Sequence, residues 1–192
     1  MRLLKWLAAA AVLCGGAASV GAQEFHPEDF GLSELRGGIT MSSLEVYGVA
    51  IQGQTLSLAN IDSVQFDAFF DLPDLDLLRW VGSPRVNLGG VVNLRGRESL
   101  AHLALTWHLP VGDVFYAEAS VGAGIHNGAL SGASAPLRNL GCRTLVYWSW
   151  GIGANLTENL TLTANLQHLS NVYACSPNDG INHFGMALGW KF

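Results

Sequence analysis

Apolar and polar residues alternate along most of this chain, from about residue 33 to its end. In residues 100–109, for example, apolar side chains stand at the odd positions and His or Thr at 102, 106 and 108. Successive side chains of a strand point to opposite faces, so this alternation predicts strands with two unlike faces. Eight such strands are predicted, over 33–42, 63–72, 84–94, 99–109, 114–125, 143–154, 159–170 and 183–192.

The connections between these strands differ in length. Residues 110–113 and 155–158 are tight turns, and 73–83 has room for a helical turn over 75–80. Longer connections cover 43–62, 126–142 and 171–182. Strands of about ten residues, with short and long connections largely at opposite ends, predict an all-β fold, an eight-stranded antiparallel transmembrane β-barrel. The final aromatic residue, Phe192, resembles the end of the last strand of outer-membrane barrels.

The polar faces of the strands separate a membrane barrel from a soluble one. A soluble, lipocalin-like barrel is the alternative, but its exterior would be richer in Lys and Glu than these strands are. A membrane barrel instead directs polar side chains into a hydrated lumen. The predicted inner row contains Glu34, Arg36, Gln65, Asp67, Asp71, Arg85, Asn87, Asn93, His102, His108 and Glu118. We expect His102, His108 and Glu118 to form a hydrogen-bond network there, and Trp107, Trp148, Trp150 and Trp190 to face lipid.

Composition and the first residues of the chain narrow the possible classes of protein further. Charged residues make up 13% of the chain, the formal net charge is -5 and no Lys/Arg run occurs, which argues against nucleic-acid binding. Residues 1–22 read as a signal peptide: Arg2 and Lys5 precede a short apolar run, and small residues end at Ala22. A single barrel domain over 23–192 then remains.

Two cysteines, Cys142 and Cys175, follow the predicted signal peptide. A secreted chain enters an oxidising compartment, so a disulfide between them is expected. Zinc binding is disfavoured because no second pair and no His partner has ligand spacing.

Two polar residues continue the lipid-facing row of the seventh strand. His168 and Ser170 follow Leu160, Leu162, Ala164 and Leu166 at every second position, so both project from the outer face. Asn182 lies on the outer row of the last strand, at the same end. Three hydrogen-bonding side chains therefore converge beside lipid, where a polar group is unfavourable unless it is used.

This constellation suggests a serine hydrolase for a lipid ester, with Ser170 as nucleophile and His168 as general base. The alternative is an interfacial His and a loop-entry Ser without chemistry. If the amino end of the first strand lies in the periplasm, this site and both cysteines lie at the extracellular end. A disulfide would hold the last loop beside the site.

The sequence His168-Leu169-Ser170-Asn171, followed by residues 177–181 and a final strand, resembles the outer-membrane lipid A deacylase family of the PagL type. The resemblance implies an eight-stranded barrel that hydrolyses the acyl ester at the 3-position of lipid A. It implies Ser170 as nucleophile, His168 as base and Asn171 as an oxyanion contributor, with no metal or cofactor.

The chain departs from that family's pattern in two places. Val172-Tyr173 stands where the family has Ala-Gly, although both residues keep backbone N–H groups. Asn182 stands where the family has a Glu that orients the His. In a Ser triad, Asp→Asn costs about 10⁴ in turnover. Three outcomes stay open: Asp179 serves as the acid, Asn182 supports a slow enzyme, or activity is lost.

The sequence thus predicts a lipid A 3-O-deacylase in the Gram-negative outer membrane, with lipopolysaccharide as substrate. A non-catalytic small outer-membrane barrel with a structural or adhesion role is the alternative.

Overall fold

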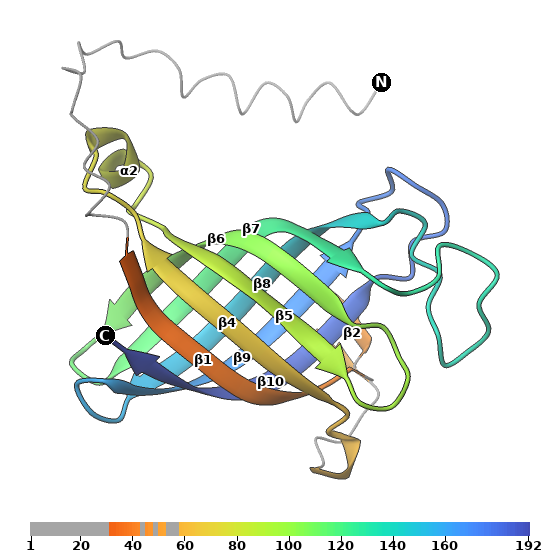
Figure 1. Cartoon of the computed structure of the whole chain (residues 1–192), viewed down its shortest axis with the longest axis horizontal. Helices are drawn as coiled ribbons and strands as arrows, with labels where there is room; N and C mark the ends of the chain where they lie inside the picture. Colours follow the sequence, from red (N-terminus) through yellow and green to blue (C-terminus); the bar gives the residue numbers. More distant parts are fainter. Residues whose placement is uncertain (1–30, 43–44, 48–49, 53–57) are drawn as a thin grey trace.

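Eight long strands close into one antiparallel barrel in the computed structural model, which describes residues 31–42, 45–47, 50–52 and 58–192 (Figure 1). The signal peptide predicted over 1–22 lies outside the described residues. The barrel strands are β1 (Gly31–Met41), β4 (Ser63–Asp71), β5 (Arg85–Asn93), β6 (Leu100–Val111), β7 (Phe115–His126), β8 (Thr144–Asn155), β9 (Leu160–Ser170) and β10 (Ile181–Lys191). Each strand pairs with its neighbour in the chain, and β1 closes the barrel on β10.

All eight predicted strands are confirmed, with ends displaced by a few residues. The difference in strand ends that matters for the candidate site is at β10, which begins at Ile181 rather than at the predicted residue 183. Asn182 therefore lies inside the strand and pairs in register with His168 of β9. The hydrogen-bonded pairing of β9 and β10 therefore fixes the distance between the backbones of His168 and Asn182.

The two ends of the barrel carry different connections, as Figure 1 shows. One end has the turns 112–114 and 156–159 and the segment 72–84, which contains the short helix α2 (Asp76–Trp80) in the region where a helical turn was predicted. The other end has the connections 42–62, 94–99, 127–143 and 171–180. The first of these includes the small hairpin β2 (Glu45–Tyr47) and β3 (Ala50–Gln52) and the turn η3 (Leu58–Asn60). Within the described part of the chain, no helix is long and apolar enough to cross a membrane.

The outer wall of the barrel is apolar and the interior is polar. Large side chains such as Leu103, Ile152 and Leu188 are more than half exposed on the wall. Glu34, Gln65, Asp67, His102 and Glu118 are buried inside, as the predicted inner row requires. This is the arrangement of a membrane barrel. It is the reverse of a soluble lipocalin-like barrel, which the structure therefore disfavours.

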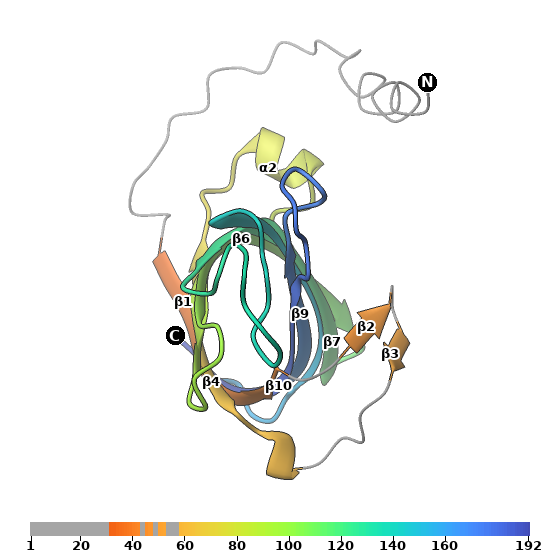
Figure 2. The ribbon, with the colours of Figure 1, turned by 90° about the vertical axis from the view of Figure 1, so that its right-hand side faces the viewer.

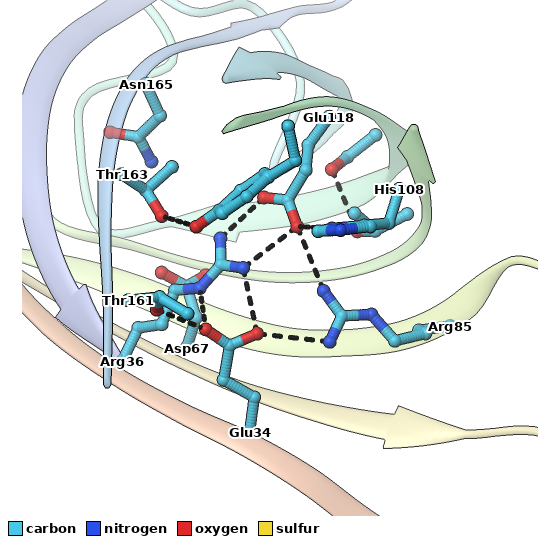
Figure 3. A network of polar contacts seen from close by, with 12 residues as sticks. Glu34, Arg36, Asp67, Arg85, His108, Glu118, Thr161, Thr163 and Asn165 are labelled. Carbon is cyan, nitrogen blue, oxygen red and sulfur yellow. Dashed lines mark hydrogen bonds and ion pairs between the residues drawn. The ribbon is translucent and has the colours of Figure 1, made fainter. Parts of the chain in front are cut away.

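A network of charged side chains lies inside the barrel, toward the end with the short turns (Figure 3). The Arg36 guanidinium donates to both oxygens of Glu34, at 2.8 and 2.9 Å, and to both oxygens of Glu118, at 2.6 and 2.8 Å. Arg85 bridges the same two carboxylates, and His108 Nδ1 lies 3.0 Å from Glu118 Oε1. Two guanidinium groups thus face two carboxylates, which balances the buried charge.

The predicted lumen roles of His108 and Glu118 are confirmed by these contacts. His102 is inside the barrel as predicted, but it is not part of this hydrogen-bond network, because neither of its ring nitrogens makes a hydrogen bond within the described part of the chain. Its Nε2 lies 3.3 Å from Asp67 Oδ1, and its ring stacks on Tyr147 with 4.0 Å between centroids. A hollow of about 480 Å³ opens beside the charged network, and Glu34, Arg85 and His108 are among the residues that line it.

Apolar side chains fill the lumen at the end with the long connections. Val91, Leu100, Leu145, Leu169 and Ile181 are buried together there, and Leu140 of the 127–143 connection is buried with them. In Figure 2 this connection, drawn in teal, lies across the opening of the barrel. Because Leu169 and Ile181 point inward, their neighbours His168, Ser170 and Asn182 point outward.

Candidate active site

The candidate site lies on the outer wall, where β9 ends and β10 begins. His168 and Ser170 stand two residues apart on β9, and Asn182 stands directly across from His168 on β10. All three share the lipid-facing side of the strands, as the alternation predicts. Asn182 is nevertheless only 8% exposed, because the neighbouring side chains cover it.

A short hydrogen bond joins two of the predicted residues. His168 Nδ1 lies 2.6 Å from Asn182 Oδ1. An amide oxygen can only accept, so Nδ1 carries the proton and donates it. In the neutral form of this ring the lone pair is on Nε2, which has no hydrogen-bond partner among the described residues. A lone pair at Nε2 is what a general base needs.

Two further residues fix the plane of the His168 ring. Trp148, its register partner on β8, packs against it with 4.9 Å between ring centroids and 35° between planes. Gly180 also lies close to the ring: a Cβ atom at this position would come within 3.3 Å of His168 Cε1. Gly180 also has a φ of 65°, a conformation that glycine adopts without strain. Both features call for glycine here.

Ser170 is near the ring but makes no hydrogen bond to it in the described part of the structure. Residues two apart on a strand have Cα atoms separated by roughly 6.5 Å, on the same face. Catalytic hydrogen bonds are often long or poorly aligned without substrate and shorten when it binds. The structure thus brings His168 and Asn182 into contact and places Ser170 beside them.

The Asn171 side chain holds the loop that follows β9. Its Nδ2 donates to Leu140 O and to Pro177 O, both at 2.9 Å, and its backbone N–H donates to Asn178 Oδ1. Both amide hydrogens are therefore occupied. The predicted oxyanion role of this side chain requires one of these bonds to be exchanged for the substrate.

The next two residues have an unusual backbone. Val172 and Tyr173 adopt left-handed conformations, with φ of 46° and 65°. This conformation is rare for residues with a Cβ atom and especially so for a β-branched one. Neither backbone N–H is donated to another atom of the described chain, and both residues are exposed. Successive unpaired N–H groups in a turn are suitable donors to an anion.

Asp179, the alternative acid, faces away from His168 toward another connection. Its carboxylate accepts the Asn139 N–H at 2.6 Å, and its own N–H donates to Asn139 O. These two bonds join the connections 127–143 and 171–180. In this conformation Asn182, rather than Asp179, orients the imidazole.

Further links hold the same two connections together. The predicted disulfide between Cys142 and Cys175 is present, with 5.7 Å between Cα atoms. Arg138 donates to Gly180 O at 3.0 Å and to Ser42 O at 2.8 Å. Burial lowers the pKa of its guanidinium from the ordinary value. The connection 127–143 thus acts as a clamp over the loop that carries Gly180 and residues 172–173.

The sequence analysis missed several of these supports. It placed Trp148 outward as a lipid anchor but did not pair it with His168. It did not single out Gly180 or Arg138, although a glycine in Asn-Asp-Gly before the last strand was a signal for a special turn. Among the described residues, no group of three or more His, Cys, Asp or Glu side chains could hold a metal ion.

Comparison with known proteins gives one family and a shared fold. The sequence profile of a family described as "Lipid A 3-O-deacylase (PagL)" matches residues 75–191, which is more than half of the chain. A search of curated proteins by sequence finds no significant match.

Two solved structures align with this chain. The crystal structure of the outer membrane enzyme PagL aligns with a TM-score of 0.56 at 13% identity, covering 83% of this chain and 100% of that one. The N-terminal β-barrel domain of Pseudomonas aeruginosa OprF aligns with a TM-score of 0.49 at 13% identity, covering 84% and 98%. At such identities, the likeness to PagL shows the fold alone.

Proposed function

Because the chain belongs to the lipid A 3-O-deacylase (PagL) family, we propose that it is a serine esterase of the outer membrane that removes the 3-O-linked acyl chain of lipid A. The observation that carries the proposal is the His168–Asn182 hydrogen bond on the outer wall. Ser170 lies two residues beyond His168 on the same face of β9. The strands span the membrane with this site at the extracellular end, where lipopolysaccharide lies. The substrate then reaches the site from the surrounding leaflet.

The first half of the reaction forms an acyl-enzyme. Ser170 Oγ attacks the ester carbonyl, and its proton passes to His168 Nε2. Asn182 Oδ1 accepts a hydrogen bond from His168 Nδ1–H throughout the reaction. This bond keeps the ring in the tautomer that leaves Nε2 free to act as the base. The charge that develops on the carbonyl oxygen is stabilised by the backbone N–H groups of Val172 and Tyr173. The imidazolium then protonates the departing sugar oxygen.

The second half releases the fatty acid. His168 Nε2 takes a proton from water, which attacks the acyl carbon, and the proton returns to Ser170 Oγ as the ester bond breaks. The products are lipid A with one acyl chain fewer and a free 3-hydroxy fatty acid. Asn182 carries no negative charge, so it stabilises the imidazolium less than a carboxylate does, and the proposed enzyme is a slow one.

The Asn171 side chain supports this chemistry indirectly. By bonding Leu140 O and Pro177 O, it keeps residues 172–173 in the turn that directs their N–H groups. The Cys142–Cys175 disulfide and Arg138 also hold this turn in place, because they join the 171–180 connection to the 127–143 connection. Catalysis in this proposal depends on Ser170 and His168, and on a loop that other residues position.

The proposal is tested with the purified barrel in detergent and purified lipid A, by measuring released 3-hydroxy fatty acid. The wild type should release it, and Ser170→Ala or His168→Ala should lower the rate by about 10³-fold or more. Ser131→Ala, in an exposed part of the 127–143 connection, is the matched control and should keep the wild-type rate. No release by a folded wild-type barrel would favour the non-catalytic alternative.

A further inference from the structure

The segment 72–84, which joins β4 to β5, carries large apolar side chains that no other part of the described chain covers. Leu77 and Trp80 of α2 are 66% and 65% exposed, and Val81 is 39% exposed. The helical turn continues to Val81, whose N–H donates to Leu77 O at 3.3 Å. Successive helical residues are about 100° apart, so positions 77, 80 and 81 share one side of the turn. These three residues are the apolar face of the segment.

The other sides of the same turn are occupied differently. Arg79 lies opposite the apolar face, where its Nε donates to Asp74 Oδ1 at 2.5 Å and its Nη1 lies 3.5 Å from Asp76 Oδ1. Leu78 lines the hollow in the mouth of the barrel. The turn is therefore amphipathic, with its charged groups paired with one another and away from the apolar face.

The segment is held against the outer wall of the barrel by β6. Trp107 Nε1 donates to Val81 O at 2.7 Å, and a Cβ atom at Gly82 would come within 3.2 Å of Trp107 Cδ1. Trp107 stands on the outward row of β6, which continues toward the short-turn end at Leu109 and Val111. Both of these side chains are more than half exposed. The apolar wall thus extends beyond the point where the segment contacts it.

We propose that the apolar face of segment 72–84 inserts into the membrane leaflet at the short-turn end of the barrel, and so anchors this end to a lipid surface. Figure 1 shows α2 outside the outline of the strands at that end. The inference goes beyond the proposed esterase and does not depend on its activity. It adds an interaction surface at the end of the barrel opposite the candidate active site.

Continuity with the wall identifies lipid as the partner. The outward row of β6 faces lipid in a membrane barrel, and Val81 lies directly on Trp107 of that row. A face that continues this row meets the same lipid. Interfacial helices bury an apolar face at the boundary between headgroups and acyl chains and keep charged groups in water. Trp is enriched at this level because its ring is amphipathic, which suits Trp80.

The size of the apolar face argues against a protein partner. A stable protein–protein interface buries roughly 800 Å² on each partner and about 20 or more residues a side. Three side chains on one helical turn provide far less than this. Insertion into lipid has no such minimum, because each apolar side chain that leaves water contributes separately.

The test attaches an environment-sensitive nitrobenzoxadiazole label to one introduced cysteine in the full barrel, refolded in phosphatidylcholine vesicles. Leu77→Cys and Trp80→Cys report on the apolar face. Asp76→Cys is the matched control, because it lies on the same turn next to Leu77 but off the apolar face. The wild-type chain, treated in the same way, gives the background. Two quenchers are compared: a nitroxide-labelled lipid, and iodide present on both sides of the membrane.

The labels at 77 and 80 should emit at shorter wavelength than the label at 76. They should also be quenched more by the nitroxide lipid and less by iodide. Equal emission and equal quenching at 76, 77 and 80 would overturn the proposal. Labels at 77 and 80 that neither quencher reaches would overturn it as well, because protein rather than lipid would then cover the face.

Two further measurements keep the result interpretable. Heat-modifiable gel mobility establishes that each labelled variant is folded, and Trp80→Cys alone tests the proposal if Leu77→Cys does not fold. Release of fatty acid from lipid A is measured on the same samples. Insertion without release contradicts the proposed function only, and release without insertion contradicts the anchor only.

Discussion

The imidazole of His168 donates its Nδ1 proton to Asn182 Oδ1 across the β9–β10 pair, at 2.6 Å. A carboxylate in this position would both orient the ring and stabilise its protonated form, whereas an amide does only the first. In the proposed site the orientation of the imidazole is therefore supported, but the positive charge of its protonated form is not. This relationship decides what a change at residue 182 should do.

Asn182→Glu should raise turnover, because it supplies the missing negative charge beside His168. The upper bound is about 10⁴-fold, the loss that the reverse change causes in a Ser triad. Asn182→Asp keeps the size of the side chain and should act in the same direction. The measurement is the rate of fatty acid release from lipid A under conditions in which the wild type is slow.

Asn182→Leu is the matched control for this prediction. It keeps the bulk of the side chain but cannot accept the Nδ1 proton, so its rate should fall below that of the wild type. If the Glu, Asp and Leu variants all react at the wild-type rate, Asn182 does not orient the catalytic base.

The Cys142–Cys175 disulfide should contribute about 3–4 kcal/mol to the free energy of unfolding, from the entropy of closing a loop with a separation of 33 residues. The double variant Cys142→Ala/Cys175→Ala should lose this stability. It should also lose activity, because the clamp over residues 172–173 and Gly180 is weakened. Denaturant unfolding in detergent and the deacylation rate are the two measurements.

A reductant provides an internal comparison for the disulfide. It should destabilise the wild type to the level of the double variant and leave that variant unchanged. Equal stability and activity of the wild type with and without reductant would show that the other links between the two connections are sufficient.

Arg36→Met should destabilise the barrel by about 3–5 kcal/mol, because it leaves Glu34 and Glu118 buried with only Arg85 between them. Arg79→Met removes an ion pair with Asp74 that is more than half exposed, and should change the unfolding midpoint little. Similar effects of the two substitutions would mean that the lumen network does not depend on Arg36.

The strands and their two faces could be predicted because alternation is a local property of the sequence. The phase of alternation alone placed His168, Ser170 and Asn182 on the outside, and the inner charged row inside. Alternation does not fix the register between strands, so the contact of Trp148 with His168 could not be predicted. The hairpin of β2 and β3 was missed because three-residue strands are too short to show a period.

The loop contacts were hidden from the sequence for a different reason. Arg138 meets Gly180, and Asn139 meets Asp179, only after the barrel has closed and brought the two connections together. The left-handed turn at Val172 and Tyr173 has no local signal either, because neither residue is of a type that favours it. Tertiary contacts impose that backbone on an unfavourable sequence.

Cleavage of an acyl ester of lipid A by Ser170 has a direct readout in the mass of lipid A from Gram-negative cells that express the wild-type chain, Ser170→Ala or Asn182→Glu. Mass spectrometry should show loss of one 3-hydroxyacyl chain with the wild type, more complete loss with Asn182→Glu, and an unmodified profile with Ser170→Ala. Identical lipid A profiles in all three strains, with all three barrels folded, would show that Ser170 does not cleave lipid A.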